Sequence, residues 1–342
     1  MQSPDLIAVV TTIQAPTQAV AALVATLTPI KAPLLIVGDA KGPLAWNLPG
    51  SELLSLKAQL SLGFRLPGLL PVGHYSRKNV GYLVAMQRQP ATIYETDDDN
   101  APLAGFRRRD LTVSARCASP GLWSNVYSYF TDWPIWPRGF PLQRIHDGAL
   151  AASTPETLSQ VDAPIQQGLA NGSPDVDAVW RLVLDREITF RNDPSVVVPP
   201  GTWCPFNSQT TWWWPVAFPL LYLPSHCSFR MTDIWRSFVA QRCLWEFGAG
   251  VVFHAPEVVQ QRNAHVLLRD FEDEIPGYLS NERLVSILGE LSLASGPASV
   301  GSNLFRCYEA LVGHGFLSSA EMPLVEAWLR DLEAFPSVGS SR

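Results

Sequence analysis

The sequence has few charged side chains and lacks an excess of basic ones. Charged residues make up 16% of the 342 positions, and 25 Lys and Arg stand against 31 Asp and Glu, a formal net charge of −6. Proteins that follow a nucleic-acid backbone need a surplus of basic side chains, so this balance argues against a nucleic-acid partner. A hydrophobic content of 47% excludes intrinsic disorder, which requires a chain with too little apolar surface to bury.

Segments that direct a protein to a membrane or to an oxidising compartment are also lacking. No apolar run approaches the roughly 20 residues that span a bilayer, and residues 1–13 have no basic flank before an apolar run, unlike a signal peptide. The five cysteines, at 117, 204, 227, 243 and 307, form no Cys-x-x-Cys pair and no metal-binding spacing. These absences predict free, mostly buried thiols in a soluble cytoplasmic protein without a transmembrane segment.

Three common catalytic motifs are absent as well. No Gly-x-Gly-x-x-Gly follows the first predicted strand, which argues against a Rossmann dehydrogenase. The chain has neither the Gly-x-x-x-x-Gly-Lys-Ser/Thr phosphate loop of P-loop NTPases nor a Gly-x-Ser-x-Gly nucleophile elbow.

The first third of the chain alternates buried strands with helices. Residues 6–12 and 34–37 are continuous apolar runs rich in β-branched side chains, typical of strands covered on both faces. Apolar residues at helical spacing follow Pro16, and residues 51–60 and 76–88 predict two further helices. Residues 92–96 predict a third strand. This order predicts an α/β fold with parallel strands and right-handed crossovers.

Polar residues follow each predicted strand, as Thr11-Thr12, Gly38-Asp39 and Asp97-Asp98-Asp99. Ligands of such sheets bind at the carboxyl ends of the strands, so we expect these residues to share one site. In an extended chain Asp97 and Asp99 point the same way, and two carboxylates on one face suit Mg²⁺ or Mn²⁺. The alternative is a solvated acidic turn whose carboxylates accept from backbone donors.

Two basic segments are present. In residues 75–82, Arg77 and Lys78 supply donors for phosphate, and Gly81 permits a close approach of the backbone. The alternative is the first turn of a surface helix. The run 107–109 is all arginine and predicts either a solvated face or contact with an anionic partner.

The remaining two thirds are rich in tryptophan and proline and then become helical. Nine of the 12 Trp lie between residues 123 and 235, in loops that either line a pocket for a flat or sugar-like ligand or fill the core. Three successive Trp at 212–214 cannot all point inward from an extended chain, so we expect at least one exposed ring. Residues 220–223 predict a strand, and helices are expected from 232, after Asn281 and after Ser319.

Seven segments along the chain form a distinctive set. They are Arg77-Lys-Asn-Val-Gly-Tyr-Leu83, Ile93-Tyr-Glu-Thr-Asp-Asp-Asp-Asn100, Trp136-Pro-Arg-Gly-Phe-Pro-Leu142, Pro174-Asp-Val-Asp-Ala178, Pro205-Phe-Asn-Ser-Gln209, Thr232-Asp-Ile-Trp-Arg236 and Arg262-Asn-Ala-His265. Together these segments resemble the STELLO-type glycosyltransferases. The resemblance covers about residues 6 to 295. Asp-x-Asp alone is weakly specific, whereas its combination with the tryptophan-containing segments is highly specific. A more distant similarity is to the reversibly glycosylated polypeptides, the UDP-arabinopyranose mutases.

The resemblance implies a GT-A, Rossmann-like fold that binds a nucleotide sugar, with a mixed, mostly parallel central sheet and a helical C-terminal region. We therefore expect a catalytic domain at 1–250, a helical region packed on it at 251–336 and a frayed tail at 337–342. The plant members carry a membrane anchor and additional sequence, so a Golgi location does not carry over to this chain.

The resemblance also implies site residues. The metal, Mn²⁺ or Mg²⁺, would bind Asp97 and Asp99, and His265 is preferred over His226 and His254 as a further ligand because it lies in a matching motif. The residues expected around the nucleotide are Thr11, Asp39, Arg77, Lys78, Asn79, Asp97, Asp98 and Arg138. Arg138 suits phosphate or sugar hydroxyls, or alternatively a structural ion pair.

A transferase that inverts the sugar needs a general base near the acceptor hydroxyl. Asp233, at the start of a predicted helix, is the first candidate, and Asp175 and Asp177 are the next. The alternative for these carboxylates is a helix cap.

Together these features predict a metal-dependent glycosyltransferase. It would move a hexosyl or pentosyl unit from a nucleotide-diphosphate sugar, with a UDP-sugar as the first choice, to a saccharide or glycan acceptor, as in polysaccharide biosynthesis. Two alternatives stay open: a nucleotide-sugar mutase, and a non-catalytic accessory subunit that binds a nucleotide sugar or a glycan. We expect a cytoplasmic location, or attachment at the periphery of a membrane.

Overall fold

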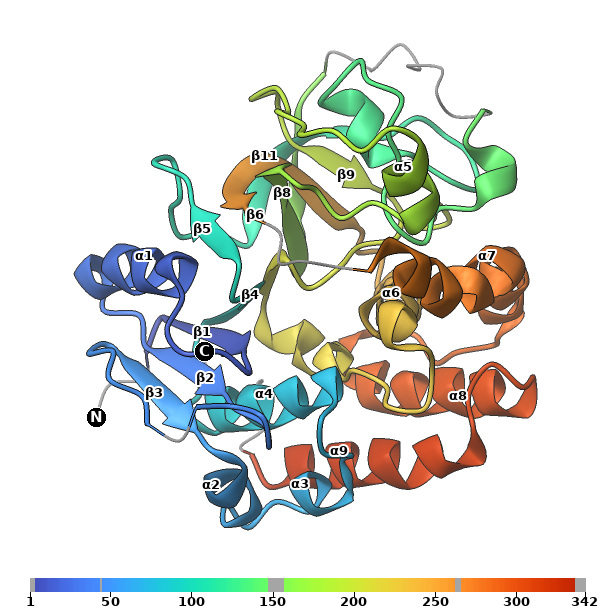
Figure 1. The fold of residues 1–342 in the computed structure, drawn as a ribbon. Coiled ribbons are helices and arrows are strands. Elements are labelled where there is room, and N and C mark those ends of the chain that lie inside the picture. The colour runs from blue at the N-terminus through green and yellow to red at the C-terminus, as the bar shows by residue number, and fades with distance from the viewer. Residues whose placement is uncertain (1–3, 44, 147–156, 262–265, 336–342) are drawn as a thin grey trace.

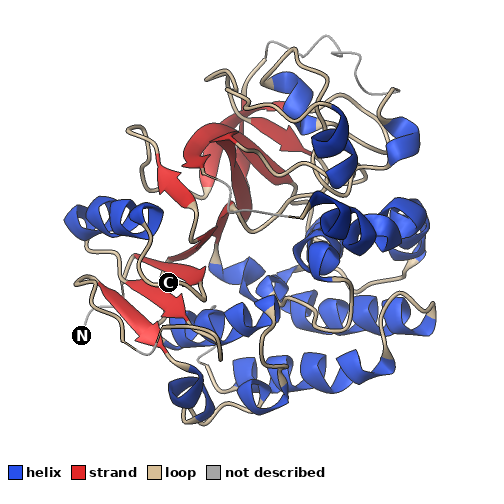
Figure 2. Cartoon of the chain, viewed as in Figure 1, coloured by secondary structure: helices blue, strands red, loops and turns tan. Residues whose placement is uncertain are grey.

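The computed structural model describes residues 4–43, 45–146, 157–261 and 266–335 and shows an α/β protein (Figure 1). A mixed sheet runs through the molecule. Most helices lie on one side of the sheet, and α1 (Gln18–Leu27) lies on the other (Figure 2). The predicted fold class is confirmed. Within the described ranges, no helix combines the length and the apolar character needed to cross a membrane.

The described strands are β1 (Leu6–Thr11), β2 (Leu34–Val37), β3 (Ser51–Leu54), β4 (Thr92–Asp97), β5 (Asn100–Pro102), β6 (Thr112–Cys117), β7 (Ser159–Asp162), β8 (Ile165–Gly172), β9 (Val196–Val198), β10 (Thr210–Trp213) and β11 (Val251–Gln260). The described α-helices, besides α1, are α2 (Leu56–Leu60), α3 (Leu66–Leu69), α4 (Lys78–Gln87), α5 (Ala178–Val183), α6 (Thr232–Trp245), α7 (Leu267–Glu290), α8 (Val300–Gly313) and α9 (Met322–Glu333).

The sheet brings the predicted polar strand ends together. Its strands follow the order β3-β2-β1-β4-β10-β8-β11-β9-β6-β7, and β5 pairs with β11. The first four of these strands are parallel. Thr11, at the end of β1, stands opposite Val37 of β2 on one side and Asp97 of β4 on the other. The three strand ends therefore meet at one edge of the sheet, as the sequence predicted.

β1 is covered on both faces because its side chains alternate between two cores. The even-numbered residues of β1 pack against α1, and the odd-numbered ones belong to the larger core on the α4 side. A Cβ atom at Gly81 of α4 would lie 2.5 Å from Val37 Cγ2 and 2.7 Å from Val9 Cγ1. The close approach that Gly81 permits is therefore with the sheet, where we had expected a phosphate.

The covered sheet also explains the run of three tryptophans. Trp212 and Trp214 belong to the core beside α1, and Trp213 belongs to the core on the opposite face. All three side chains are buried. The expectation of an exposed ring was wrong, because it assumed that only one face of this segment would be covered.

Three other predicted elements differ from the structure. Residues 51–60 form β3 and then α2, because the Ser55 hydroxyl accepts from Ala58 N and caps a new helix there. Residues 220–223 form no strand. The first two are the end of a 3₁₀ helix at Pro215–Leu221, and the other two follow it. The two prolines of this segment lack the backbone N–H groups that strand pairing needs. Asn281 lies inside α7, where its amide bonds Gly139 O and the Trp235 indole instead of capping a helix.

The helical region starts later than residue 250. β11 lies between β8 and β9, so the sheet continues to residue 260 and α7 begins at residue 267. Helices α6, α7 and α8 pack against one another, and α9 packs against α8. Residues 336–342, which include the expected frayed tail, lie outside the described residues.

Candidate active site

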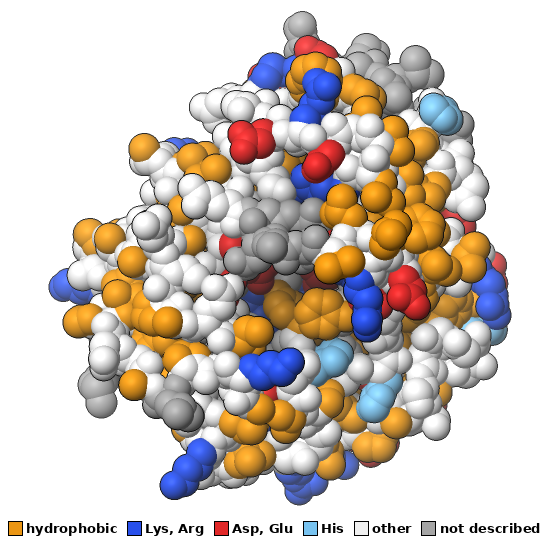
Figure 3. Space-filling model, in the orientation of Figure 1, with side chains coloured by type: hydrophobic (Ala, Val, Ile, Leu, Met, Phe, Trp, Pro, Cys, Tyr) orange, Lys and Arg blue, Asp and Glu red, His pale blue; other side chains and the backbone are white. Residues whose placement is uncertain are grey.

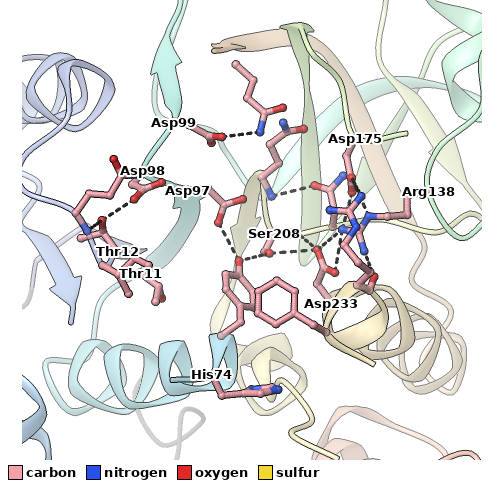
Figure 4. Close-up of a pocket in the computed structure, with 18 of the residues that line it drawn as sticks. Thr11, Thr12, His74, Asp97, Asp98, Asp99, Arg138, Asp175, Ser208 and Asp233 are labelled. Carbon is pink, nitrogen blue, oxygen red and sulfur yellow. Dashed lines mark hydrogen bonds and ion pairs between the residues drawn. The ribbon is translucent and has the colours of Figure 1, made fainter. Parts of the chain in front are cut away.

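A cavity of about 560 Å³ opens at the carboxyl ends of β1, β2 and β4. One wall carries Thr11, Thr12, Asp39 and the acidic triplet, and the opposite wall carries Arg138, Asp175, Arg230 and Asp233 (Figure 4). Ile13, Val176 and Phe229 add apolar surface. On the same face of the molecule, hydrophobic side chains gather over α5 and the start of α7, where Val183 and Leu268 are exposed (Figure 3).

The acidic triplet is fixed to the first strand and helix. Asp97 ends β4, and Asp98 and Asp99 form the turn into β5. The Thr12 hydroxyl donates to Asp98 Oδ2 at 2.5 Å, and the Thr17 hydroxyl donates to the Asp98 carbonyl at 2.5 Å while also capping α1. The triplet is therefore an ordered part of the cavity wall, in contrast to a freely solvated turn.

Asp97 is held by a buried cation and a tyrosine. Lys78 Nζ lies 3.1 Å from Asp97 Oδ1, and the Tyr75 hydroxyl donates to the same oxygen at 2.9 Å. Burial raises the pKa of Asp97, and Lys78 and Tyr75 oppose that rise. Lys78 is itself fully buried and also donates to Thr96 O at 2.8 Å. Lys78 thus acts on the cavity through Asp97 and does not line it.

Asp99 has one oxygen without a partner. Gln260 Nε2 donates to Asp99 Oδ2 at 3.0 Å, whereas Asp99 Oδ1 is buried and accepts no hydrogen bond from the described residues. Burial, with added repulsion from Asp97 and Asp98, raises the pKa of Asp99 to about 7. A buried carboxylate oxygen without a donor is costly, so this atom is suited to a bound cation or proton.

Asp39 shapes the wall next to the triplet. Its Oδ1 accepts from Ala40 N at 2.6 Å and from Gly73 N at 2.9 Å, and its Oδ2 accepts from His74 N at 3.0 Å. Asp39 therefore ties the loop after β2 to the loop that precedes α4. It lines the cavity as expected, but its carboxylate is largely committed to backbone donors.

At the opposite wall, Arg138 forms ion pairs with two carboxylates, Asp175 and Asp233. Arg138 Nε and Nη2 donate to the two oxygens of Asp175 at 2.8 Å each, and Nη2 also lies 3.0 Å from both oxygens of Asp233. Burial alone would raise the pKa of Asp233, but Arg138 and Arg236 outweigh it and the pKa is lowered. A carboxylate in this state is a weak base, which fits an anchoring role for Asp233 better than proton abstraction.

Two hydroxyl groups connect the walls. Tyr75 Oη lies 2.5 Å from Ser208 Oγ, and Ser208 in turn donates to Asp233 Oδ2 from both its N–H and its hydroxyl at 3.3 Å. Sequence reasoning assigned no role to Tyr75, Ser208 or Gln260. Ser208 lies in the segment 205–209, which carries the family resemblance, and Tyr75 lies two residues before the segment 77–83. Gln260 reaches Asp99 from 161 positions away and gave no local signal.

Some expected site residues lie away from the cavity. The buried Arg77 guanidinium donates to Gln59 Oε1 and to the carbonyls of Pro67 and Leu70, so it is committed to the fold. The Asn79 side-chain amide bonds the backbone of Leu223 twice, because Nδ2 donates to the Leu223 carbonyl and Oδ1 accepts from the Leu223 N–H. Neither side chain lines the cavity, because both face the interior beneath the first turns of α4.

Asp177 also lies outside the cavity. Its carboxylate caps α5 by accepting from Trp180 N at 2.8 Å and also accepts from the Trp136 indole at 2.5 Å. Burial raises the pKa of Asp177 to about 7, although both donors oppose the rise. The alternative interpretation as a helix cap describes its position in the structure.

The expected third metal ligand is not placed by the structure. His265 lies outside the described residues. His254 is buried between Ser195 and Gln166 in the sheet, and His226 does not line the cavity. In the part of the chain that the structure describes, no three His, Cys, Asp or Glu side chains are grouped closely enough to hold a metal ion.

Comparison with known proteins agrees with the motifs. Residues 230–338 match the family model of the STELLO glycosyltransferases. The chain is 31% identical over 324 residues to "Probable glycosyltransferase STELLO2" and 31% identical over 328 residues to "Probable glycosyltransferase STELLO1", both from Arabidopsis thaliana. The alignments include 87% and 88% of this chain but only 41% of each relative, so the chain spans less than half of their length. The chain is thus a STELLO-like protein, related to the STELLO glycosyltransferases over most of its own length.

Proposed function

We propose that this protein is a glycosyltransferase that takes its sugar from a nucleotide-diphosphate donor, a UDP-sugar in the first instance, with the help of Mn²⁺ or Mg²⁺. The observation that carries the proposal is the acidic triplet at the edge of the parallel strands, where Asp99 presents a buried carboxylate oxygen to which no described residue donates. The family relationship supports the same chemistry.

The residues present fit a hard divalent cation. Such ions prefer carboxylate oxygens and keep several positions for water and phosphate. Among the residues that the structure describes, none donates to Asp99 Oδ1, and Asp97 offers a second carboxylate on the same wall. With no group of three protein ligands in the described residues, the remaining ligands would be water and the donor diphosphate. The cation would neutralise the diphosphate as it leaves the sugar.

The opposite wall is suited to orienting the sugar and its acceptor. Arg138 is fixed in one direction by Asp175 and Asp233, and a preoriented guanidinium binds phosphate or hydroxyl oxygens at little entropic cost. Phe229, which is 53% exposed, offers an apolar ring beside these charges. We place a saccharide acceptor in this half of the cavity.

The pairing of Asp233 with Arg138 favours a second candidate reaction. The lowered pKa of Asp233 makes this carboxylate a poor acceptor for a proton, so a reaction that needs no protein base is compatible with the site as it stands. A transfer with retention of configuration and a nucleotide-sugar mutase reaction are of this kind. The proposal covers transfer of either a hexosyl or a pentosyl unit. The nucleotide sugar that binds determines which of the two is transferred.

Calorimetric titration with a panel of nucleoside diphosphates and their sugars tests the proposal. Each ligand is measured with Mn²⁺ and with chelator, on the wild type, on Asp99→Ala and on Asp193→Ala. Asp193 is a matched control because its carboxylate forms an ion pair with Arg191 outside the cavity. We expect one nucleotide to bind in a metal-dependent manner, with affinity reduced at least about tenfold in Asp99→Ala and unchanged in Asp193→Ala.

Turnover separates the candidates. Release of the nucleoside diphosphate with sugar appearing on an acceptor supports a transferase, and an isomerised nucleotide sugar supports a mutase. Binding without either product would identify an accessory subunit. Failure of every nucleotide to bind under both conditions would refute the donor site.

A further inference from the structure

Four polar side chains that line the cavity, Asp97, Tyr75, Ser208 and Asp233, form an unbroken row. Figure 4 labels Asp97, Ser208 and Asp233 of this row. Tyr75 Oη is 2.9 Å from Asp97 Oδ1 and 2.5 Å from Ser208 Oγ, and Ser208 Oγ is 3.3 Å from Asp233 Oδ2. The two ends belong to different walls, since Asp97 ends β4 and Asp233 lies in the first turn of α6. The row is therefore the direct polar connection between the acidic triplet and the arginine wall.

The row has more oxygen–oxygen contacts than hydroxyl hydrogens to bridge them. Its three oxygen–oxygen contacts require three hydrogens when both carboxylates are ionised, but Tyr75 and Ser208 have one hydroxyl hydrogen each. At any moment one contact lacks a hydrogen. Lys78 Nζ donates to the Tyr75 oxygen at 2.9 Å, so that oxygen is stabilised as an acceptor while its own hydrogen can turn toward either neighbour.

The charges at Asp97 and Asp233 determine which of the three contacts lacks a hydrogen. When Asp97 is a bare carboxylate, Tyr75 donates to it and Ser208 donates toward Tyr75 or Asp233. A cation on Asp97 withdraws electron density from the carboxylate and weakens it as an acceptor. Tyr75 then donates to Ser208, and Ser208 donates to Asp233. No proton leaves its oxygen in this change, because each hydroxyl only rotates about its C–O bond.

We propose that Tyr75 and Ser208 are positioning residues that form a reversible hydrogen-bond relay, through which cation binding at Asp97 strengthens the hold on Asp233 and its partner Arg138. This inference rests on the proposed function, because it takes a cation at the triplet as its input. Thermodynamic linkage requires the reverse effect as well. When Asp233 accepts the Ser208 hydrogen, Ser208 can accept from Tyr75, and Asp97 then loses the Tyr75 hydrogen and is available to the cation.

The structure contains a control for the loss of charge on the arginine wall. Asp175 and Asp233 both pair with Arg138, but Asp233 also bonds Ser208 and acts on Asp97 through space. Asp175→Asn removes a negative charge from the same wall and leaves the relay intact. The part of the excess effect of Asp233→Asn over Asp175→Asn that depends on the Tyr75 hydroxyl therefore measures the relay.

A double-mutant cycle on cation affinity tests the relay without any activity measurement. Mn²⁺, alone and with UDP, is titrated into the wild type, Asp233→Asn, Tyr75→Phe and the double variant, and Asp175→Asn is measured with and without Tyr75→Phe. We expect the excess of Asp233→Asn over Asp175→Asn in weakening Mn²⁺ binding to be about fivefold larger with Tyr75 than with Tyr75→Phe, as for one hydrogen bond. The excess that remains with Tyr75→Phe is the through-space effect of the Asp233 charge on Asp97.

Ser208→Ala provides a second route, because it removes the middle hydroxyl and leaves Tyr75 on Asp97. The difference between the two aspartate variants should shrink by the same factor in this background. Far-ultraviolet circular dichroism and thermal melting show whether each variant is folded. An unchanged difference in Tyr75→Phe or Ser208→Ala would overturn the relay while leaving the donor site standing. Coupling without any sugar transfer would support the relay and contradict the proposed function. Absence of Mn²⁺ binding to the wild type in every condition would overturn both.

Discussion

Neutralising Glu95 should destabilise the protein more than any surface ion pair could. Glu95 lies in β4 two residues before Asp97 and is fully buried. Its Oε1 is 2.8 Å from Arg236 Nη2 and accepts from the Trp213 indole at 2.9 Å, and its Oε2 accepts from Tyr82 and Arg236. Arg236 belongs to α6, so this carboxylate joins the central strand to the helix that carries Asp233.

The expected magnitude follows from what Glu95→Gln leaves behind. The amide keeps the size of the side chain but places an N–H₂ group where an oxygen accepted from two donors, and it leaves the buried Arg236 cation without its directly paired carboxylate. Breaking a buried pair from one side costs about 3–5 kcal/mol. A chain of this size loses about 2 °C in melting temperature per kcal/mol, so we expect a fall of about 6–10 °C.

Thermal melting followed by tryptophan fluorescence and circular dichroism measures the effect, with Glu52→Gln as the control. Glu52 also bonds an arginine, Arg88, at 2.8 Å, but this pair is exposed and should contribute less than about 1 kcal/mol. The added variant Glu95→Gln with Arg236→Met should recover part of the loss, because no buried charge is left unpaired. Equal effects of the Glu95 and Glu52 variants would refute the reasoning.

Two further predictions concern packing and pH. Gly81→Ala should lower the free energy of unfolding by about 1–3 kcal/mol, because its Cβ would lie 2.5 Å from Val37 Cγ2. Gly289→Ala in α7 meets open space and should raise this free energy by about 0.5–1 kcal/mol. Urea unfolding measures both. Burial raises the pKa of Asp177 to about 7 from 3.8, so its protonated form contributes stability that is lost as the pH rises from about 4 through 7. Asp177→Asn, which keeps a capping oxygen, should melt with less dependence on pH across this range; parallel pH profiles for wild type and variant would contradict this.

The parallel half of the fold was predictable because its signals are local. Continuous apolar runs marked β1 and β2, and helical spacing after Pro16 marked α1. The meeting of Thr11 with Asp97 followed from a general property of parallel sheets and needed no knowledge of side-chain contacts. The antiparallel half gave weaker signals, since the burial of Trp212 and its neighbours depends on two layers contributed by distant segments.

The site was predictable as a set of residue types but not as a set of contacts. The sequence placed Asp97 and Asp99 at a strand end, where the structure has them. It offered Arg77 either as a phosphate donor or as part of the first turn of a surface helix, and both interpretations assume a solvated side chain. In the structure the guanidinium is buried and donates to backbone carbonyls. Whether Asp233 is basic depends on Arg138, which lies 95 positions earlier in the chain.

The row of hydroxyls and carboxylates across the cavity also limits how this protein can be divided. Tyr75 meets Ser208 across 133 positions, and Asp99 meets Gln260 across 161. A fragment that ends before residue 205 would contain the acidic triplet and every strand of the parallel half, yet it would lack Ser208, Arg230 and Asp233 and so leave the far wall incomplete. The half with the parallel strands is therefore not a transferable module, and new specificities would have to come from exchanging side chains within the intact chain.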